Sequence, residues 1–514
     1  MTLLGIDVGT TGCKVALFSL QGEILASAYR EYDAQSPQAG WAQLDSCAIW
    51  EAVKATIRSV TIANPGAEIQ AVSVSSLGEA VVPVSADRQI LGPSILNYDI
   101  RGEEFLPDLA ALLPNERLYA INGNTLGNHF GLTKLKWMRA HQPELYERTY
   151  KFLHWGSFIA FMLGADPVVD YSLANRTLLF DIHQSQWSET LLEVASLDLA
   201  KLPATVPSGT VIGSVAASVA AELGLPPGVQ IVSGAHDQCA NAVGAGVVDA
   251  GSTVFGMGTY HCITPVFSTP PDPQLMIGRG LNTEHHAIPG RYVSFIYNQG
   301  GALVKWFRDT FAAVEHRQAE AQGRSVYPDL FAEISLEPGN VLVLPHFAPT
   351  GPPRFMADSA GMIAGLHLGT PRGEILKGII EGVAFFLKEL VDSLPATGIK
   401  IENYRAVGGG SRSDAWVQTC ADIFGKPFTR PVIIEAGALG AAIIAGVGAG
   451  VFADYTQAVA AMVKLERTFE PDLSRHTRYQ ARYHNYHHMA PLMAEMAREL
   501  SAETRPQGKN LSEK

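Results

Sequence analysis

The chain has 514 residues, of which 47% are hydrophobic and 17% are charged, as is typical of folded globular proteins. This length exceeds what one ordinary core supports, so we expect at least two domains. The formal net charge of −12 argues against a nucleic-acid partner, because such surfaces need concentrated basic charge.

The cysteines and the N-terminus indicate the compartment. The five cysteines are scattered and form neither a CxxC pair nor a cluster at zinc spacing, which is typical of reduced thiols. Asp7 and Lys14 interrupt the first apolar run, unlike the core of a signal peptide. No apolar stretch is long enough to cross a bilayer. We therefore expect a cytoplasmic protein with no membrane partner.

The N-terminal segment predicts an α/β unit. Residues 3–18 read LLGIDVGTTGCKVALF, two β-rich arms around a glycine-bracketed turn, which predicts a hairpin. A third strand is expected over residues 23–32 and a helix over residues 41–61, followed by strands over residues 69–77 and 80–85. Strands, a helix and a further strand in this order are typical of α/β proteins.

The middle of the chain is more helical. Apolar spacing predicts helices over residues 134–146, 154–164 and 188–197. Next come a strand over residues 229–234, a polar turn over residues 235–238 and a small-residue helix over residues 239–246. From about residue 468 onward we expect a polar helix and a loose end.

Residues 252–267, STVFGMGTYHCITPVF, repeat the outline of the first hairpin. The Gly-Thr pairs of the two turns lie about half a chain apart. This spacing predicts a duplicated α/β lobe, with an N-terminal lobe over residues 1–250 and a C-terminal lobe over residues 251–514. The alternative is a chance recurrence of two such turns.

The two turns suit anions. Thr10 and Thr11 stand between glycines, whose bare backbone lets successive N–H groups form a nest for phosphate oxygens. No Walker sequence is present. Asp7 would repel phosphate unless a divalent cation lies between them, and carboxylate oxygens suit Mg²⁺. The alternative is a structural hairpin in which Asp7 caps its own turn. Gly258 and Thr259 would bring a second nest to the same polyphosphate.

Asp237 is the candidate catalytic base. It follows an expected strand and precedes a helix, and open α/β sheets bind ligands at such strand ends. A base that deprotonates a hydroxyl during phosphoryl transfer needs this position. The alternative is that Asp237 caps the helix, since Asp is a favoured N-cap residue. His236 is expected to be structural.

A third glycine run, Gly408–Gly410, ends a strand and precedes a helix. Bare backbone there lets a flat ring or a phosphate lie against the chain, although a tight strand-to-helix turn is an alternative. A small-residue helix over residues 435–446 is expected to pack behind this run.

Polar groups for a small substrate are expected near other strand ends. Glu79, Asp99 and Arg101 suit the hydroxyls of a sugar. Each of them taken singly also suits a surface position or a salt bridge.

Taken in order, these motifs resemble the FGGY family of carbohydrate kinases, within the actin, Hsp70 and hexokinase superfamily. The likeness runs from Gly5 to about Gly450. It is carried by six segments: residues 5–18, 134–146, 233–246, 255–259, 365–385 and 408–423.

The resemblance implies an α/β fold of two duplicated actin/Hsp70/hexokinase-like (ribonuclease H-like) lobes with a cleft between them. Sugar and catalytic base would belong to the N-terminal lobe, and ATP to the C-terminal lobe. Asp237 would be the base, and Asp7 and Asp237 would hold Mg²⁺. Implied sugar contacts are Glu79, Asp99, Arg101 and Gln238. Implied ATP contacts are Thr10, Thr11, Gly258, Thr259, Gly409, Gly410 and Ser413.

The implied activity is transfer of the γ-phosphoryl group of ATP to a hydroxyl of a ketose, with D-xylulose as the first choice and a homodimer as a possible assembly. Members that phosphorylate xylulose usually have a histidine where this chain has Glu79. Glycerol-phosphorylating members have an arginine-glutamate pair where it reads Gly78-Glu79. The alternatives are therefore a kinase of another ketose or polyol, or an ATPase switch like actin and Hsp70.

Overall fold

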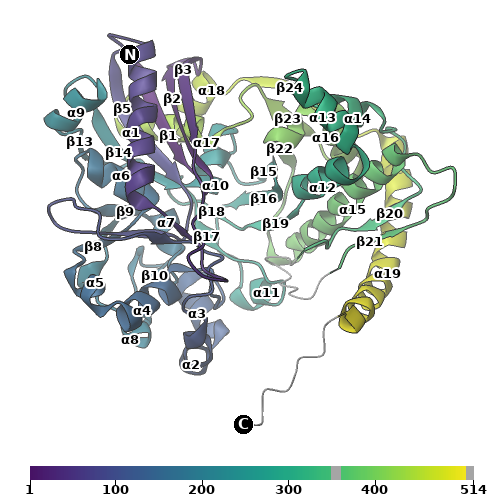
Figure 1. Ribbon diagram of the computed structural model, residues 1–514, viewed down its shortest axis with the longest axis horizontal. Coiled ribbons are helices and arrows are strands. Elements are labelled where there is room, and N and C mark those ends of the chain that lie inside the picture. The colour runs from purple at the N-terminus through teal and green to yellow at the C-terminus, as the bar shows by residue number, and fades with distance from the viewer. Residues whose placement is uncertain (349–359, 505–514) are drawn as a thin grey trace.

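The computed structural model describes residues 1–348 and 360–504. The first half of the chain builds a six-stranded sheet in the order β13-β14-β5-β1-β2-β3, and the second half builds an eight-stranded sheet (Figure 1). The strands of the first sheet are β1 Thr2–Val8, β2 Gly12–Ser19, β3 Ile24–Glu31, β5 Ile69–Ser76, β13 Val211–Ser214 and β14 Gln230–His236. Those of the second are β15 Ser252–Met257, β16 Tyr260–Phe267, β17 Glu284–His285, β18 Tyr292–Val293, β19 Ile296–Gln299, β22 Asn403–Val407, β23 Phe428–Pro431 and β24 Leu465–Phe469.

The two sheets repeat one topology. β1 pairs antiparallel with β2 and parallel with β5, just as β15 pairs antiparallel with β16 and parallel with β22. β5 then pairs parallel with β14, and β22 with β23. Each of these last strands takes an antiparallel neighbour, β13 or β24. The predicted duplicated α/β fold is therefore confirmed.

Short strands complete the structure outside these sheets. They are β4 Gln43–Leu44, β6 Val81–Val84, β7 Ser94–Ile95, β8 Lys151–His154, β9 Val168–Asp170, β10 Phe180–Asp181, β11 Gln186–Trp187, β12 Ala204–Val206, β20 Leu342–Leu344 and β21 Met362–Ala364.

Helices of the first half lie against its sheet or below it (Figure 1). They are α1 Ser46–Ala63, α2 Leu106–Leu112, α3 Asn115–Asn122, α4 Gly131–His141, α5 Pro143–Arg148, α6 Trp155–Leu163, α7 Tyr171–Asn175, α8 Glu189–Ala195, α9 Ala217–Leu223 and α10 Asp237–Gly244. The helix expected over residues 134–146 is thus wrong as one element. It is two helices, because Pro143 cannot continue α4 and instead opens α5.

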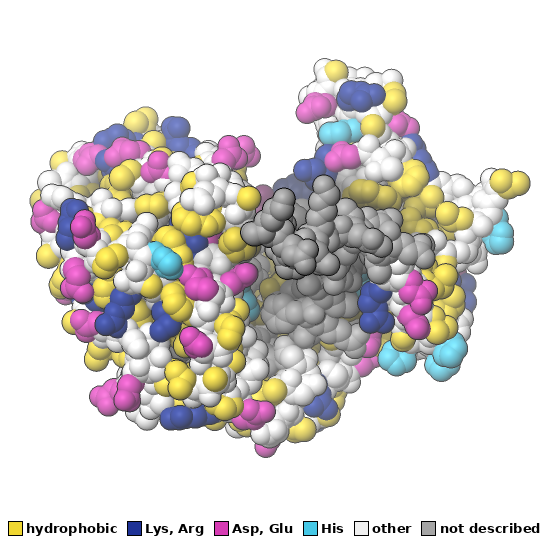
Figure 2. Space-filling view, turned by 60° about the horizontal axis from the view of Figure 1, so that its bottom comes forward, with side chains coloured by type: hydrophobic (Ala, Val, Ile, Leu, Met, Phe, Trp, Pro, Cys, Tyr) yellow, Lys and Arg dark blue, Asp and Glu magenta, His cyan; other side chains and the backbone are white. Residues whose placement is uncertain are grey.

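Helices of the second half follow in the same way. They are α11 Pro273–Ile277, α12 Gly301–Phe311, α13 Ala313–Ala321, α14 Tyr327–Ala332, α15 Arg372–Asp392, α16 Asp414–Phe424, α17 Gly437–Gly448, α18 Tyr455–Met462 and α19 Leu473–Thr504. None of the helices in the described ranges is both long and apolar enough to span a membrane. On the face shown in Figure 2, acidic and basic side chains are interspersed.

The polar turn expected over residues 235–238 is wrong. Strand β14 continues to His236, and α10 begins at the next residue, Asp237. The strand therefore passes directly into the helix, which fixes the position of Asp237 at the end of the sheet.

Helix α17 lies between β23 and β24 of the second sheet in the chain but packs against the first sheet (Figure 1). It contacts β1, β5, β14 and α10, and its residues 437–446 are buried. The approach is close: a Cβ added at Gly5 of β1 would lie 1.8 Å from the carbonyl oxygen of Ala438. The helix also begins beside the third glycine run, because the N–H of Gly408 donates to the carbonyl of Ile434 at 2.9 Å, but its small residues let most of its length lie flat on the first sheet.

Candidate active site

Asp237 is the first residue of α10, directly after strand β14, which lies between β13 and β5 in the first sheet. Its carboxylate does not cap the helix: the N-cap residue is His236, and no side-chain capping bond is formed. Instead, Asp237 Oδ1 accepts a hydrogen bond of 3.2 Å from Gln238 Nε2. The side chain is 33% exposed, which leaves one side open to a substrate hydroxyl.

The electrostatic surroundings favour a base at Asp237. Burial raises its pKa to about 7, and the negative charges of Asp7 and Glu79 add to the shift. Nε2 of His236 lies 3.2 Å from Oδ1, but burial lowers the pKa of His236 well below its ordinary value. The imidazole is therefore neutral and does not offset the negative charges. A carboxylate whose pKa lies near 7 is suited to accept a proton at neutral pH.

Asp7 stands in β1, opposite Lys14 of β2. Its Oδ1 accepts a hydrogen bond of 2.7 Å from Ser75 Oγ, so it does not cap its own turn. Burial raises the pKa of Asp7, against the effects of Ser75 and Lys14. A Cβ added at Gly437 would lie 2.5 Å from Asp7 Oδ2. The start of α17 therefore has to be bare where it covers this carboxylate.

The segment before α17 ties the two halves together beside Asp7. Lys14 of β2 forms an ion pair with Glu435. This bond lowers the pKa of Glu435, and the charge of Arg412 acts in the same direction. Arg412 comes two residues after the third glycine run, so the end of this run lies within electrostatic reach of Glu435 and the first hairpin.

The first turn is exposed at its tip and braced from behind. The N–H of Gly9 donates to the carbonyl of Gly12 at 2.9 Å, and Tyr32 Oη donates to the carbonyl of Gly9 at 2.7 Å. Thr10 is half-buried and Thr11 is exposed. The turn thus presents the threonines and bare backbone outward, as a phosphate nest requires.

The second turn is braced by the start of α12. N–H groups of Gly300, Gly301 and Ala302 donate to the carbonyls of Gly258 and Thr259 at 3.0–3.1 Å. The carbonyls of Gly258 and Thr259 are thus bonded on the side of the turn that faces α12. The two residues themselves are exposed on the opposite side. The two predicted turns therefore share the arrangement of a braced hairpin with a free tip.

The third glycine run lies against this second turn. A Cβ added at Gly408 would come to 3.3 Å from the N atom of Gly258, and one at Gly410 to 3.0 Å from Met257 Cβ. Gly409 has open space on its Cα. Ser413 accepts a hydrogen bond of 3.3 Å from the N–H of Trp416 and so caps α16. The structure thus brings together the predicted ATP contacts of the second half.

Glu79 is not a surface residue but part of a buried ionic triad. Its Oε1 accepts hydrogen bonds from Arg176 Nε, at 2.9 Å, and from Arg176 Nη2. Arg176 Nη1 donates to Glu284 Oε1 at 2.5 Å. All three residues are less than 10% exposed. Although burial opposes it, the two carboxylates hold the pKa of Arg176 far above its ordinary value.

The guanidinium of Arg176 is also enclosed by rings. It lies 4.9 Å from the ring centroid of Phe130 and 5.7 Å from that of Phe295. A Cβ added at Gly78 would come to 2.9 Å from His236 Nε2 and 3.1 Å from Arg176 Cγ. The bare Gly78 therefore leaves room for Arg176 and His236, next to Asp237.

Asp99 and Arg101 form a second buried pair. Arg101 donates to both carboxylate oxygens of Asp99 at 2.6–3.0 Å, and the N–H of Ala42 donates to Oδ2 at 2.5 Å. Although burial opposes it, these bonds hold the pKa of Asp99 below its ordinary range. Arg101 lies 4.2 Å from the ring centroid of Trp41. The two side chains satisfy each other's charge and hydrogen-bonding groups. Their contact with a sugar stays a prediction.

Sequence reasoning missed Arg176 and Glu284. Both come from segments without a recognisable motif. Neither has a charged residue two, three or four positions away that would indicate an ion pair. One signal was available: an arginine inside the apolar run of residues 171–182 needs a counter-charge if it is buried. The identity of that counter-charge depends on the tertiary fold.

Known proteins match nearly the whole chain. The model of the "FGGY family of carbohydrate kinases, N-terminal domain" matches residues 2–244, and that of the C-terminal domain matches residues 258–449. A xylulose kinase of Escherichia coli (strain K12) is 27% identical, covering 96% of this chain and 100% of its own. A glycerol kinase of Delftia acidovorans is 30% identical, covering 92% and 95%. The crystal structure of xylulose kinase from Rhodospirillum rubrum superposes with a TM-score of 0.84 at 26% identity, covering 96% and 99%.

The duplicated sheets, the braced hairpins and these matches define a carbohydrate kinase, a phosphotransferase with an alcohol group as acceptor. The chain belongs to the FGGY family of carbohydrate kinases.

Proposed function

We propose that this kinase transfers the γ-phosphoryl group of ATP to a hydroxyl of a ketose, with D-xylulose as the first substrate to test and Asp237 as the general base. The observation that carries the proposal is the position of Asp237. It lies at the carboxyl end of β14, a strand inside the first sheet, and is one-third exposed, and burial raises its pKa to about 7.

In this proposal, Asp237 accepts the proton of the attacking hydroxyl while the hydroxyl oxygen forms a bond to the γ-phosphorus. The bond between that phosphorus and the β,γ-bridging oxygen breaks, and ADP leaves with the electron pair. Phosphoryl transfer depends mainly on alignment and on neutralisation of charge. The tips around Thr10, Thr11 and Thr259 supply hydroxyls and backbone N–H groups for the phosphates. Gly409, whose Cα faces open space, would border the nucleoside.

Magnesium fits the donor set at Asp7 and Asp237. Within residues 1–348 and 360–504, no three His, Cys, Asp or Glu side chains converge into a preformed metal cage. Mg²⁺ commonly uses one or two carboxylates together with phosphate oxygens and water. Oδ2 of Asp7 carries no hydrogen bond from Ser75, which donates to Oδ1. The ion would supply positive charge between these carboxylates and the phosphates.

A polyol such as glycerol is the second candidate acceptor. The observation that favours it is the ion pair between Glu79 and Arg176. It supplies an arginine-glutamate pair beside Asp237 although residue 78 is glycine. Relatives named for either substrate are similar to this chain to about the same degree. The cytoplasmic location and the homodimer stay predictions.

The test is ATP consumption, coupled to NADH oxidation, against a panel of pentuloses, hexuloses and polyols that includes D-xylulose and glycerol. We expect a ketose to raise turnover at least tenfold above the rate with ATP alone. Turnover that no member of the panel stimulates would contradict the proposal and favour an ATPase switch.

A further inference from the structure

The charges beside the proposed base do not cancel. Glu79 and Glu284 are two carboxylates that share the one guanidinium of Arg176. The triad therefore carries one net negative charge when all three groups are ionised. Asp237 adds a second when it is deprotonated. Because these groups are largely buried, their field is weakly screened.

The other cations near this site contact groups other than Glu79 and Glu284. Lys134 Nζ donates to the carbonyls of Asp99 and Arg101 at 2.6 and 2.8 Å, and Arg101 is paired with Asp99. Burial lowers the pKa of His154 to about 3, with the charge of Arg176 adding to the shift. His154 and His236 are therefore neutral. Within the described part of the chain, Arg176 is the buried cation that forms an ion pair with Glu79.

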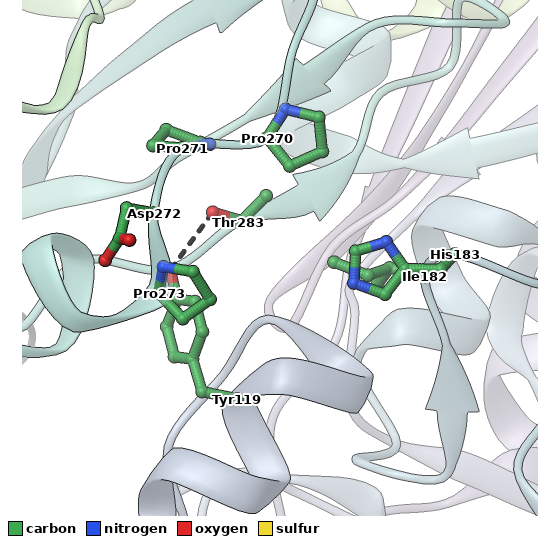
Figure 3. Close-up of a pocket in the computed structure, with 8 residues that line it drawn as sticks. All are labelled: Tyr119, Ile182, His183, Pro270, Pro271, Asp272, Pro273 and Thr283. Carbon is green, nitrogen blue, oxygen red and sulfur yellow. Dashed lines mark hydrogen bonds between the residues drawn. The ribbon is translucent and has the colours of Figure 1, made fainter.

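Glu284 is held firmly although it comes from the second half of the chain. Its Oε1 also accepts a hydrogen bond of 2.6 Å from Asn282 Nδ2. The N–H of His285 donates to Asn175 Oδ1 at 3.2 Å. Thr283 Oγ1 lies 3.0 Å from Tyr119 Oη of α3, at the wall of a cavity of about 270 Å³ (Figure 3). Strand β17 thus docks on the first half and carries Glu284 to Arg176.

The second carboxylate oxygen of Glu284 forms no hydrogen bond with another described residue. This oxygen, Oε2, is buried. The polar contacts of Glu284 are therefore those of Oε1, with Arg176 as its charged partner and Asn282 as its neutral one. Removing its charge would leave Glu79 and Arg176 as a neutral pair and would change the local charge by one unit.

We propose that Glu284 is a specificity-determining positioning residue: by sharing Arg176 with Glu79, it keeps the acceptor site net negative, so that the kinase takes uncharged ketoses and polyols and rejects sugar acids. This inference rests on the proposed sugar kinase function. A guanidinium paired with one carboxylate is neutral overall and does not repel a substrate carboxylate, whereas one shared by two carboxylates leaves a net negative charge that does.

The test compares the wild type with Glu284→Gln, using D-xylulose and D-xylonate as neutral and anionic probes of equal carbon number. Binding is measured by calorimetry and turnover by ATP consumption. In the wild type we expect D-xylonate to bind at least about tenfold more weakly than D-xylulose, and in Glu284→Gln we expect the ratio to shift toward the acid by about tenfold. At an effective dielectric near 20, one unit charge about 12 Å away has an effect of this size, and a closer charge has a larger one.

Two further variants separate specificity from simple damage. Glu284→Asp keeps the charge and should keep the wild-type ratio even if both affinities fall. Glu381→Gln makes the same chemical change in another buried network, where Glu381 of α15 accepts a hydrogen bond from Arg482 Nε at 3.1 Å. It should leave the ratio unchanged.

Three outcomes would overturn the inference. In the first, wild-type protein binds D-xylonate as tightly as D-xylulose, a measurement that needs no variant to fold. In the second, Glu284→Gln weakens both ligands equally. In the third, Glu381→Gln shifts the ratio as much as Glu284→Gln does. Because binding is read independently of turnover, absence of ketose phosphorylation would count against the proposed function while the charge preference is still decided.

Discussion

The carbonyl oxygen of Ala240 lies directly against Gly440, where an added Cβ would come within 1.8 Å of it. The contact joins α10, which begins with the proposed base, to α17, which covers Asp7. A second contact of the same kind lies nearby: a Cβ at Gly244 would be 2.0 Å from the carbonyl of Ala436. The two helices thus cross backbone to backbone, and the geometry of the site depends on that crossing.

Gly440→Ala tests the crossing. The methyl group would have to displace helix backbone, so we expect a loss of at least about 1–3 kcal/mol in the free energy of unfolding. Thermal unfolding followed by calorimetry measures it. Gly369→Ala is the matched control, since a Cβ there meets open space. Equal stability of Gly440→Ala and wild type would show that α10 and α17 separate without cost.

Asp237→Asn tests the base. The amide cannot accept the hydroxyl proton, so we expect kcat to fall by about 10²–10⁴-fold. Affinity for ATP without Mg²⁺, measured by calorimetry, should be little changed, because the proposed ATP contacts lie on the hairpins and the third glycine run. Normal turnover in this variant would remove Asp237 from the role of base.

The pH dependence follows from the raised pKa of Asp237. The base must be deprotonated, so kcat/KM should fall about tenfold per pH unit as the pH drops below about 7 and should level off above it. Glu79→Gln removes a negative charge that raises this pKa, so the acid limb should move to lower pH. The position of the limb can be read even if Glu79→Gln is slow. An unmoved limb would mean that Glu79 does not act on Asp237.

Asp7→Asn tests the metal assignment. If Asp7 helps to hold Mg²⁺, the variant should need a higher Mg²⁺ concentration for half-maximal velocity, by about tenfold or more. Titration of Mg²⁺ at constant ATP concentration measures this. Asp249→Asn, at a carboxylate that is 71% exposed, should leave the titration unchanged. An unaltered Mg²⁺ requirement in Asp7→Asn would contradict the role.

Arg176→Met tests the triad as a structural element. It would leave Glu79 and Glu284 buried without a counter-charge, which costs about 3–5 kcal/mol when one partner of a buried pair is removed. Urea unfolding followed by tryptophan fluorescence measures the loss. Adding Glu284→Gln to this variant should recover part of the stability, because one uncompensated charge is then gone. A double variant less stable than Arg176→Met alone would contradict this account.

Local sequence patterns were sufficient for the duplicated hairpins and for the position of Asp237 at the end of a strand. Glycine-bracketed turns between β-rich arms specify their own geometry, and a strand followed by small residues places a side chain at the sheet edge. The expected turn over residues 235–238 was wrong because His236 still pairs with Ser76 of β5. Pairing with a neighbouring strand overrode the local preference of polar residues for a turn.

The triad and the position of α17 could not be predicted in the same way. Arg176, Glu79 and Glu284 are far apart in the chain and meet only when strand β17 docks on the first half. Helix α17 is apolar on all sides, so its sequence says that it is buried but not against which sheet. Both features depend on contacts between halves, which periodicity within one half does not encode.

The burial of α17 on the first sheet also limits how the chain can be divided. Its topology repeats, yet a fragment that ends near residue 250 would leave β1 and β5 without their apolar cover, and the complementary fragment would carry α17 with nothing to bury it. Expressed alone, each half would expose a large apolar surface and tend to aggregate. The two sheets of repeated topology therefore form one folding unit, and split or domain-swapped versions should require both fragments to be present together.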